Sequence, residues 1–307
     1  MSAPSSGSHD ASARAILYAF MANLGIAIAK TWAALFTGSG SMMAEAIHSF
    51  ADSTNQVLLF LGLKRSLKPA DDEHPLGYGK LSYFWSFIVA IVLFSLGGLF
   101  SIYEGVHKLQ NPEPLNQIWV AIGVLVLAVF LEGGAMFGVL REVKKLRGSK
   151  PLSEWLRHTR NAELVVIFGE DLAALTGLTL ALIALLLTVY TGNPVFDAMG
   201  SIAIGIVLIF VSLFLVLRIR SLLIGKSAEP DLQELLDEIA AADDSVERVL
   251  NTITLQFGPD MMLAMKIQMK PGISIDVAVD RINALERELK AQVPSLKWCF
   301  VEPDSKA

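Results

Sequence analysis

The chain is poor in the residues that build disulfides, metal cages and charged surfaces. Cys299 is its single cysteine among 307 residues, so an intrachain disulfide and a cysteine-rich metal site are both excluded. Charged residues make up only 18% of the sequence, below the roughly 25% of an ordinary soluble domain. The sequence also has no HExxH motif, no Ser/His/Asp constellation and no glycine-rich phosphate loop beside its acidic clusters, which argues against a hydrolase.

Long apolar runs dominate instead. Hydrophobic residues make up 53% of the chain, and six runs reach about 20 residues or more, the length that crosses bilayer hydrocarbon. These runs cover residues 16–35, 41–63, 83–106, 118–140, 164–190 and 196–217. Because backbone groups in hydrocarbon must satisfy their own hydrogen bonds, we expect helices. The sequence therefore predicts an α-helical polytopic membrane protein with six transmembrane helices over 14–222, after a disordered, serine-rich N-terminus over 1–13.

Lysine and arginine are distributed unevenly between the two sets of connections. The connections after the second and fourth runs carry ten basic residues: Lys64, Arg65, Lys68, Arg141, Lys144, Lys145, Arg147, Lys150, Arg157 and Arg160. The connections after the first, third and fifth runs carry only Lys108. The positive-inside rule places these connections, and both termini, in the cytoplasm. The net charge of -5 comes without a basic surface, so no nucleic-acid partner is expected.

After Gly225 the composition becomes mixed, which predicts a soluble cytoplasmic domain over 223–307. Pro230 is placed to open a helix, 246–257 reads as a strand, and the residues from Met261 to Met269 alternate with period two as a second strand. Helical spacing from Ile275 to Leu289 and a last strand over 296–301 complete an αββαβ order. This is an α+β domain of roughly 80 residues, near the lower size limit of a stable domain, so dimerisation would help it.

One ionisable cluster stands out inside the second run. Glu45, His48 and Asp52 are three, four and seven residues apart, so on a helix they share one face. A charged side chain at mid-membrane costs about 2.5 to 3.5 kcal/mol on insertion scales, so such residues are usually kept for a function. The cluster is a candidate half of a metal site.

The fifth run supplies a second cluster at the same depth. Counting about 1.5 Å per residue, His48 and Asp52 lie near mid-membrane, and Glu170 and Asp171 lie about half way through from the other side. Imidazole nitrogen and carboxylate oxygen suit a divalent first-row ion such as Zn²⁺. We therefore expect His48, Asp52 and Asp171 to be metal ligands.

Five short segments form a recognisable pattern: the HSxxD run at 48–52, Asn55-Gln56, the His-Pro-Leu-Gly-Tyr-Gly-Lys loop at 74–80, and the segments 197–201 and 222–225. With these segments the chain resembles the cation diffusion facilitator family over nearly its full length. The fifth run resembles the subgroup that includes a mitochondrial zinc transporter once described as a nuclear coactivator. The resemblance implies six spans, a ferredoxin-like αββαβ cytoplasmic domain, a homodimer, and export of a divalent metal against protons.

The sequence departs from the family pattern at one expected ligand. Members commonly carry histidine or aspartate four residues before the fifth-span aspartate, where this chain has Ile167. Glu170 is the natural substitute ligand, although neighbouring helical residues such as Glu170 and Asp171 point about 100° apart. Glu163, on the stripe of Glu170 and nearer the cytoplasm, is a candidate for lining the path to the site.

A second departure lies in the loop between the second and third runs. Asp71 and His74 match a peripheral metal site of some members, and we include them as weaker candidates because Tyr78 stands where those members have a second histidine. The C-terminal domain has no histidine, which argues against the metal-sensing sites of some relatives.

Each assignment has a structural alternative. His48 and Asp52 can form a hydrogen-bonded pair that ties two helices together, and Glu170 can be the partner of a buried donor such as Lys30. Glu45 lies nearer the outer end, where it would be either a wetted vestibule carboxylate or a transient ligand.

We interpret the protein as a transporter that exports a divalent metal by alternating access. We expect it to be no enzyme and to carry no prosthetic group. Zn²⁺ is the first choice of cargo, and an Mn²⁺ or Fe²⁺ exporter is the alternative because carboxylates suit harder ions. A membrane metalloenzyme and a non-transporting membrane scaffold are the alternatives from other classes. The short N-terminal segment favours a bacterial inner membrane over an organelle.

Overall fold

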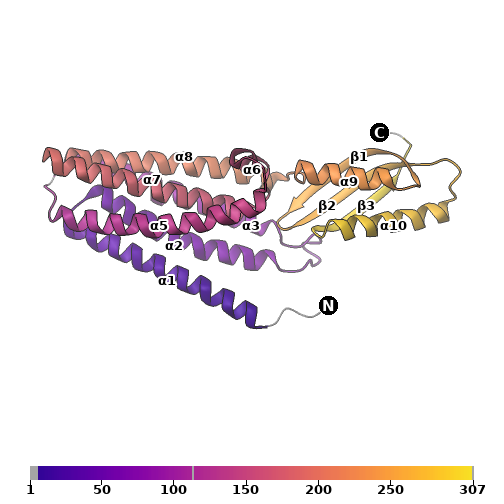
Figure 1. The fold of residues 1–307 in the computed structure, drawn as a ribbon, viewed down its shortest axis with the longest axis horizontal. Helices are drawn as coiled ribbons and strands as arrows, with labels where there is room; N and C mark the ends of the chain where they lie inside the picture. Colours follow the sequence, from indigo (N-terminus) through magenta and orange to yellow (C-terminus); the bar gives the residue numbers. More distant parts are fainter. Residues whose placement is uncertain (1–5, 113, 306–307) are drawn as a thin grey trace. The chain divides into compact units, whose positions relative to one another are not determined.

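The computed structural model describes residues 6–112 and 114–305 (Figure 1). Its first helix, α1, spans Ser6–Thr37 and so begins inside the segment that the sequence predicts as disordered. Ala11, Ala13 and Ala15 explain the difference, because alanine has the highest helix propensity and continues the apolar run backwards. The expectation for residues 1–5 lies outside the described part of the chain.

Among its described residues, the first compact unit consists of helices and short connections, and it contains residues up to Leu61 together with 85–148 and 163–217. After α1 come α2 (Gly40–Ser66), α3 (Leu81–Val92), a π-helical segment (Leu93–Leu99) and α4 (Phe100–Gln110). The unit continues with α5 (Ile118–Arg147), α7 (Ala162–Thr191) and α8 (Val195–Ile224), and several of these helices run on into the second unit at one end.

Four helices are both long enough and apolar enough to cross a membrane. They cover 81–110, 118–147, 162–191 and 195–224, and each contains 30 residues. α1 and α2, which the sequence predicts as the first two spans, do not meet this criterion over their described residues. In α2 the reason is the polar stripe itself, because Glu45, His48, Asp52 and Asn55 lower the mean hydropathy of the helix.

Glycines bring the 81–110 helix and α8 close together. A Cβ on Gly98 would lie 2.6 Å from the Ile209 side chain, and a Cβ on Gly205 would lie 2.7 Å from the Gly98 carbonyl oxygen. Small residues at such crossings let helix backbones approach in a membrane, where lipid is as apolar as leucine. The π-helical segment occurs at this crossing and contains Gly97 and Gly98.

The second compact unit contains the C-terminal domain, with the connecting residues 62–84 and 149–162 and the end of α8. Its elements are a short helix α6 (Leu152–His158), which the sequence did not predict, then α9 (Pro230–Ala242), β1 (Val246–Phe257), β2 (Asp260–Met269), α10 (Ile275–Gln292) and β3 (Leu296–Pro303). The C-terminal order is the predicted αββαβ. The domain boundary expected between residues 222 and 223 is close to Arg218, where the C-terminal part of this unit begins. The unit also includes residues 62–84 and 149–162, which connect helices of the first unit.

The sheet has the order β1-β2-β3, with β1 and β2 antiparallel and β2 and β3 parallel. Alternate residues of β2 are buried, as its period-two pattern predicts: Met261, Leu263, Met265 and Ile267. They pack in one core with residues of both helices, among them Leu236 of α9 and Leu285 and Leu289 of α10. Met261 and Met265 are therefore core residues of this domain.

Candidate metal site

One stripe of α2 presents buried polar atoms that lack hydrogen-bond partners. The His48 side chain is fully buried, and its Nδ1 lies 3.5 Å from Asp52 Oδ1, one helical turn further on. Both ring nitrogens of His48 and Oδ1 of Asp52 are buried without a hydrogen bond. Since buried polar groups are normally satisfied, these atoms are available to a ligand from outside the chain.

The two expected ligands on α7, Glu170 and Asp171, differ in their hydrogen bonds and in their burial. Asn55 Nδ2, one turn beyond Asp52 on the α2 stripe, donates a hydrogen bond of 2.5 Å to Glu170 Oε1. Glu170 is buried, whereas Asp171 is half-buried with its Oδ2 atom buried and unpaired. Asn55 was not predicted from the sequence as the partner of Glu170, although its spacing of three residues from Asp52 puts it on the same face.

The described side chains do not form an assembled coordination shell. Across residues 6–112 and 114–305, no group of three or more histidine, cysteine, aspartate or glutamate side chains is close enough to hold a metal ion. The structure thus pairs His48 with Asp52 and places Glu170 on Asn55, without gathering all four expected ligands. The four-residue ligand set therefore stays a prediction.

Glu45 is bonded to a buried lysine. Lys30 Nζ on α1 lies 3.2 Å from Glu45 Oε2 and donates a hydrogen bond of 2.7 Å to Ser49 Oγ, and both charged side chains are fully buried. The second carboxylate oxygen, Oε1, has no hydrogen-bond partner and lies against Gly177 of α7, where a side chain would collide with it. Glu45 is consequently a buried ion-pair partner, not a wetted vestibule group, and Lys30 contacts Glu45 instead of Glu170.

A carboxylate from α8 fixes the start of α2. Asp197 accepts hydrogen bonds from Ser39 Oγ at 2.7 Å, from the Gly40 N–H at 2.6 Å and from the Ser41 N–H at 3.3 Å, and also from the Ser41 hydroxyl. The first N–H groups of a helix have no intrahelical acceptor, so a buried carboxylate there both caps the helix and complements its dipole. Asp197 therefore holds the N-terminal end of the helix that carries His48 and Asp52.

The weaker loop candidates, Asp71 and His74, lie together in the second unit. Asp71 Oδ2 accepts from Lys68 Nζ at 2.7 Å and from the Tyr78 hydroxyl at 2.8 Å, while His74 Nδ1 lies 3.7 Å from Asp71 Oδ1. These bonds, that from Lys68 first, hold the pKa of Asp71 well below its usual range. The Lys68 ammonium already pairs with the Asp71 carboxylate, which makes this loop a poor cation site.

The two remaining positions of interest lie in the first part of α7. Glu163, the second residue of the helix, is half-buried. Ile167, at the position where a fourth ligand was expected, leaves 36% of its surface exposed. Its helix face is therefore only partly directed into the bundle, unlike that of buried Glu170.

Comparisons with known proteins agree on one family. The sequence-family model of the cation efflux transmembrane domain matches residues 16–224 of this chain. The mitochondrial proton-coupled zinc antiporter SLC30A9 of Xenopus laevis is 33% identical over 261 residues, which cover 84% of this chain and 46% of that protein. Metal tolerance protein C4 of Arabidopsis thaliana is 32% identical over 73% of this chain and 49% of its own length. The zinc transporter ZitB of Escherichia coli is 24% identical over 89% of this chain and 83% of its own length. The chain spans about half the length of the first of these relatives.

Proposed function

The chain belongs to the cation diffusion facilitator family, and on this premise we propose that it exports a divalent transition-metal cation, Zn²⁺ first, in exchange for protons. It is an integral multi-pass membrane protein. Two of its relatives are by name a proton-coupled zinc antiporter and a zinc transporter, which supports transport over an enzymatic or scaffold role.

The proposed architecture has six spans and two cytoplasmic termini. Four helices meet the length and hydropathy of a span. The matched transmembrane domain, residues 16–224, also covers α2 and α1 from residue 16 onward. The concentration of lysine and arginine on the connections after the second and fourth spans supports the orientation. We further propose a homodimer, because the C-terminal domain is small for independent stability.

The observation that carries the proposed site is the set of buried, unpaired ligand atoms on α2 and α7. His48, Asp52 and Asp171 each leave such an atom, and His48 and Asp52 sit one helical turn apart. We propose that these three residues bind the transported ion, and that Glu170 joins them when it leaves Asn55. Glu45, Glu163, Asp71 and His74 would then act outside the coordination shell.

Proton coupling follows from the chemistry of the same ligands. A metal binds deprotonated imidazole and carboxylate, so protons and metal compete for one set of atoms. Imidazole is the side chain that ordinarily exchanges a proton near neutral pH, which makes His48 the proposed proton carrier. When the site opens outward, protonation would release the metal; when it opens inward, metal binding would release the protons.

The identity of the metal is the finer part of the proposal. One nitrogen ligand with two or three carboxylates also suits Mn²⁺ or Fe²⁺, whereas the zinc-transporting relatives favour Zn²⁺. We keep the bacterial inner membrane as the proposed location, since bacterial ZitB aligns over 89% of this chain, although the SLC30A9 relatives are mitochondrial.

Metal flux into sealed vesicles tests the proposal. Purified protein is reconstituted, a pH gradient is imposed, and uptake of Zn²⁺, Mn²⁺ and Fe²⁺ is followed with an internal dye. We expect zinc uptake that collapses with the gradient and is abolished in Asp52→Ala. Asp280→Ala, which removes an exposed carboxylate of α10, is the matched control and should transport normally. Absence of flux for every metal in well-inserted protein would contradict the proposal.

A further inference from the structure

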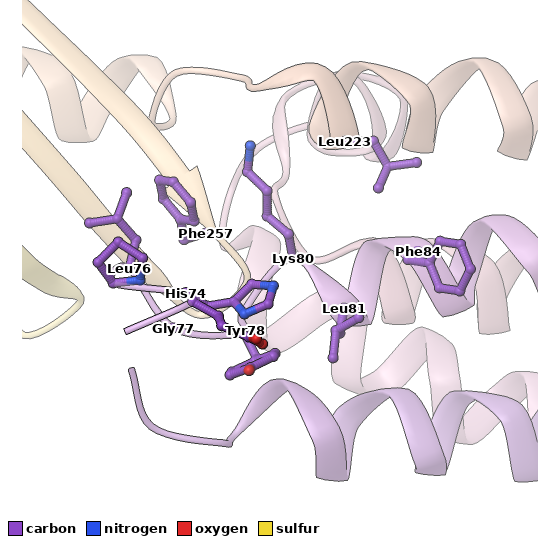
Figure 2. Close-up of a pocket in the computed structure, with 11 residues that line it drawn as sticks. His74, Leu76, Gly77, Tyr78, Lys80, Leu81, Phe84, Leu223 and Phe257 are labelled. Atoms are coloured by element: carbon purple, nitrogen blue, oxygen red, sulfur yellow. The ribbon is translucent and has the colours of Figure 1, made fainter. Parts of the chain in front are cut away.

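A cavity of about 490 Å³ lies in the second compact unit, and the described residues that line it include none of the four proposed metal ligands. Figure 2 shows its wall, which combines the loop before α3, the first turn of α3, the end of α8 and the end of β1. Leu81, Phe84, Leu223 and Phe257 give it an apolar surface. The metal-transport proposal leaves this cavity without a role.

Next to the cavity, the loop before α3 and the β1–β2 turn pack closely against each other. Gly79 and Gly258 touch through their backbones: a Cβ on Gly258 would lie 2.6 Å from the Gly79 carbonyl oxygen, and one on Gly79 would collide with the Phe257 carbonyl oxygen. Gly258 has φ +63°, which glycine adopts without strain. The Tyr83 hydroxyl donates a hydrogen bond of 3.2 Å to the Gly258 carbonyl oxygen. The loop before α3, which lines the cavity, is therefore packed tightly against the β1–β2 turn.

The cavity lies at the ends of two membrane-length helices. Leu81 is the first residue of the 81–110 helix, and Leu223 is next to the last residue of α8. Phe84 keeps 45% of its surface exposed. Where spans of this length end, lipid headgroups meet water, so a lipid chain can reach the apolar surface and its headgroup the adjoining loop.

Two opposite charges line the same cavity, from Lys80 and Glu73. The Lys80 ammonium lies 4.8 Å from the centroid of the Phe257 ring. Within the described residues, neither Lys80 nor Glu73 forms a side-chain hydrogen bond or ion pair. His74 and Tyr78, also in the lining, are already engaged with Asp71. The cavity thus offers one free cation and one free anion among its described residues.

We propose that this cavity binds one phospholipid whose headgroup carries both a phosphate and a primary ammonium, the chemistry of phosphatidylethanolamine. The phosphate accepts from Lys80, the ammonium donates to Glu73, and an acyl chain lies along Leu81, Phe84 and Leu223. The proposal depends on the chain being a membrane protein and not on which ion it transports.

The pair of charges selects among headgroups. Phosphatidylglycerol offers a phosphate to Lys80 but no cation to Glu73. Phosphatidylcholine carries a quaternary ammonium without an N–H, so it cannot donate a hydrogen bond to the Glu73 carboxylate. A free headgroup lacks the acyl chain and leaves the apolar half of the cavity uncovered.

Lipid retention by the purified full-length chain tests the proposal. Detergent-solubilised protein is incubated with equal amounts of phosphatidylethanolamine, phosphatidylglycerol and phosphatidylcholine of the same acyl length, and bound lipid is counted by native mass spectrometry. A membrane-surface lysine contributes roughly fivefold to the binding of an anionic group. Lys80→Gln should therefore weaken phosphatidylethanolamine and phosphatidylglycerol alike by about fivefold, whereas Glu73→Gln should weaken phosphatidylethanolamine alone.

Lys64→Gln is the matched control, because Lys64 is an exposed lysine near the end of α2 that does not line the cavity. It should retain lipid as the unmodified chain does. The proposal is overturned if Lys80→Gln retains phosphatidylethanolamine fully, if Lys64→Gln loses as much, or if phosphatidylcholine binds equally well. Displacement by glycerophosphoethanolamine at equal concentration would likewise overturn it, since that headgroup has no acyl chain. If Lys80→Gln aggregates, Lys80→Met, which keeps an unbranched side chain without the charge, replaces it.

Discussion

The buried pair between Lys30 and Glu45 allows a quantitative prediction. Both side chains are fully buried, the charges are 3.2 Å apart, and the only other partner of Lys30 Nζ among the described residues is Ser49 Oγ. Removing one member of such a pair leaves an uncompensated charge, which costs roughly 3–5 kcal/mol. Replacing both members by apolar residues of similar volume is often neutral. Glu45→Leu should therefore lower the free energy of unfolding by about 3–5 kcal/mol, and Lys30→Met/Glu45→Leu should recover most of it.

A surface pair supplies the control. Lys145 Nζ and Glu142 Oε2 on α5 are 2.7 Å apart, but their side chains are 63% and 51% exposed. Exposed pairs contribute about 0–1 kcal/mol, so Glu142→Leu should change stability by less than about 1 kcal/mol. The measurement is denaturant unfolding in detergent followed by tryptophan fluorescence, for Glu45→Leu, Lys30→Met/Glu45→Leu and Glu142→Leu.

The same variants separate structure from transport. Because Glu45 is bonded to Lys30, we expect the Lys30→Met/Glu45→Leu protein to retain zinc flux in vesicles. The reasoning about the pair is refuted if Glu45→Leu is as stable as the unmodified chain, or if the double variant is no more stable than Glu45→Leu. A stable double variant without flux would place Glu45 on the metal path.

Three further outcomes are expected. Asp52→Asn should abolish high-affinity zinc binding in calorimetry while the protein still inserts and elutes normally; unchanged affinity would remove Asp52 from the site. Glu170→Gln keeps an oxygen that can accept from Asn55, so it should remain folded, yet lose more zinc affinity than Glu163→Gln; an equal loss would reduce both carboxylates to a general electrostatic effect. Asp197→Asn presents an NH₂ group to at least one donor at the start of α2, which should cost about 1–3 kcal/mol of stability; thermal unfolding measures this loss, and an unshifted transition would show that the cap contributes little.

Local periodicity explains how much of the fold the sequence predicts. The αββαβ order and the buried side of β2, which includes Met261 and Met265, follow from period-two and helical spacing. Composition was less informative at the N-terminus, where Ser6 already begins a helix. The sequence also did not predict α6, a short helix of seven residues that is too short to show a repeating apolar pattern.

For the candidate site, the sequence determined which residues share a helix face, because the helical repeat fixes the spacing of His48, Asp52 and Asn55 on α2. It could not determine what each face meets, since that depends on how neighbouring helices rotate and slide against one another. Only the tertiary structure decided that Lys30 pairs with Glu45, that Glu170 is turned onto Asn55, and that Asp197 caps α2. These contacts join residues far apart in sequence, and packing of small residues such as Gly177 against Glu45 sets their register.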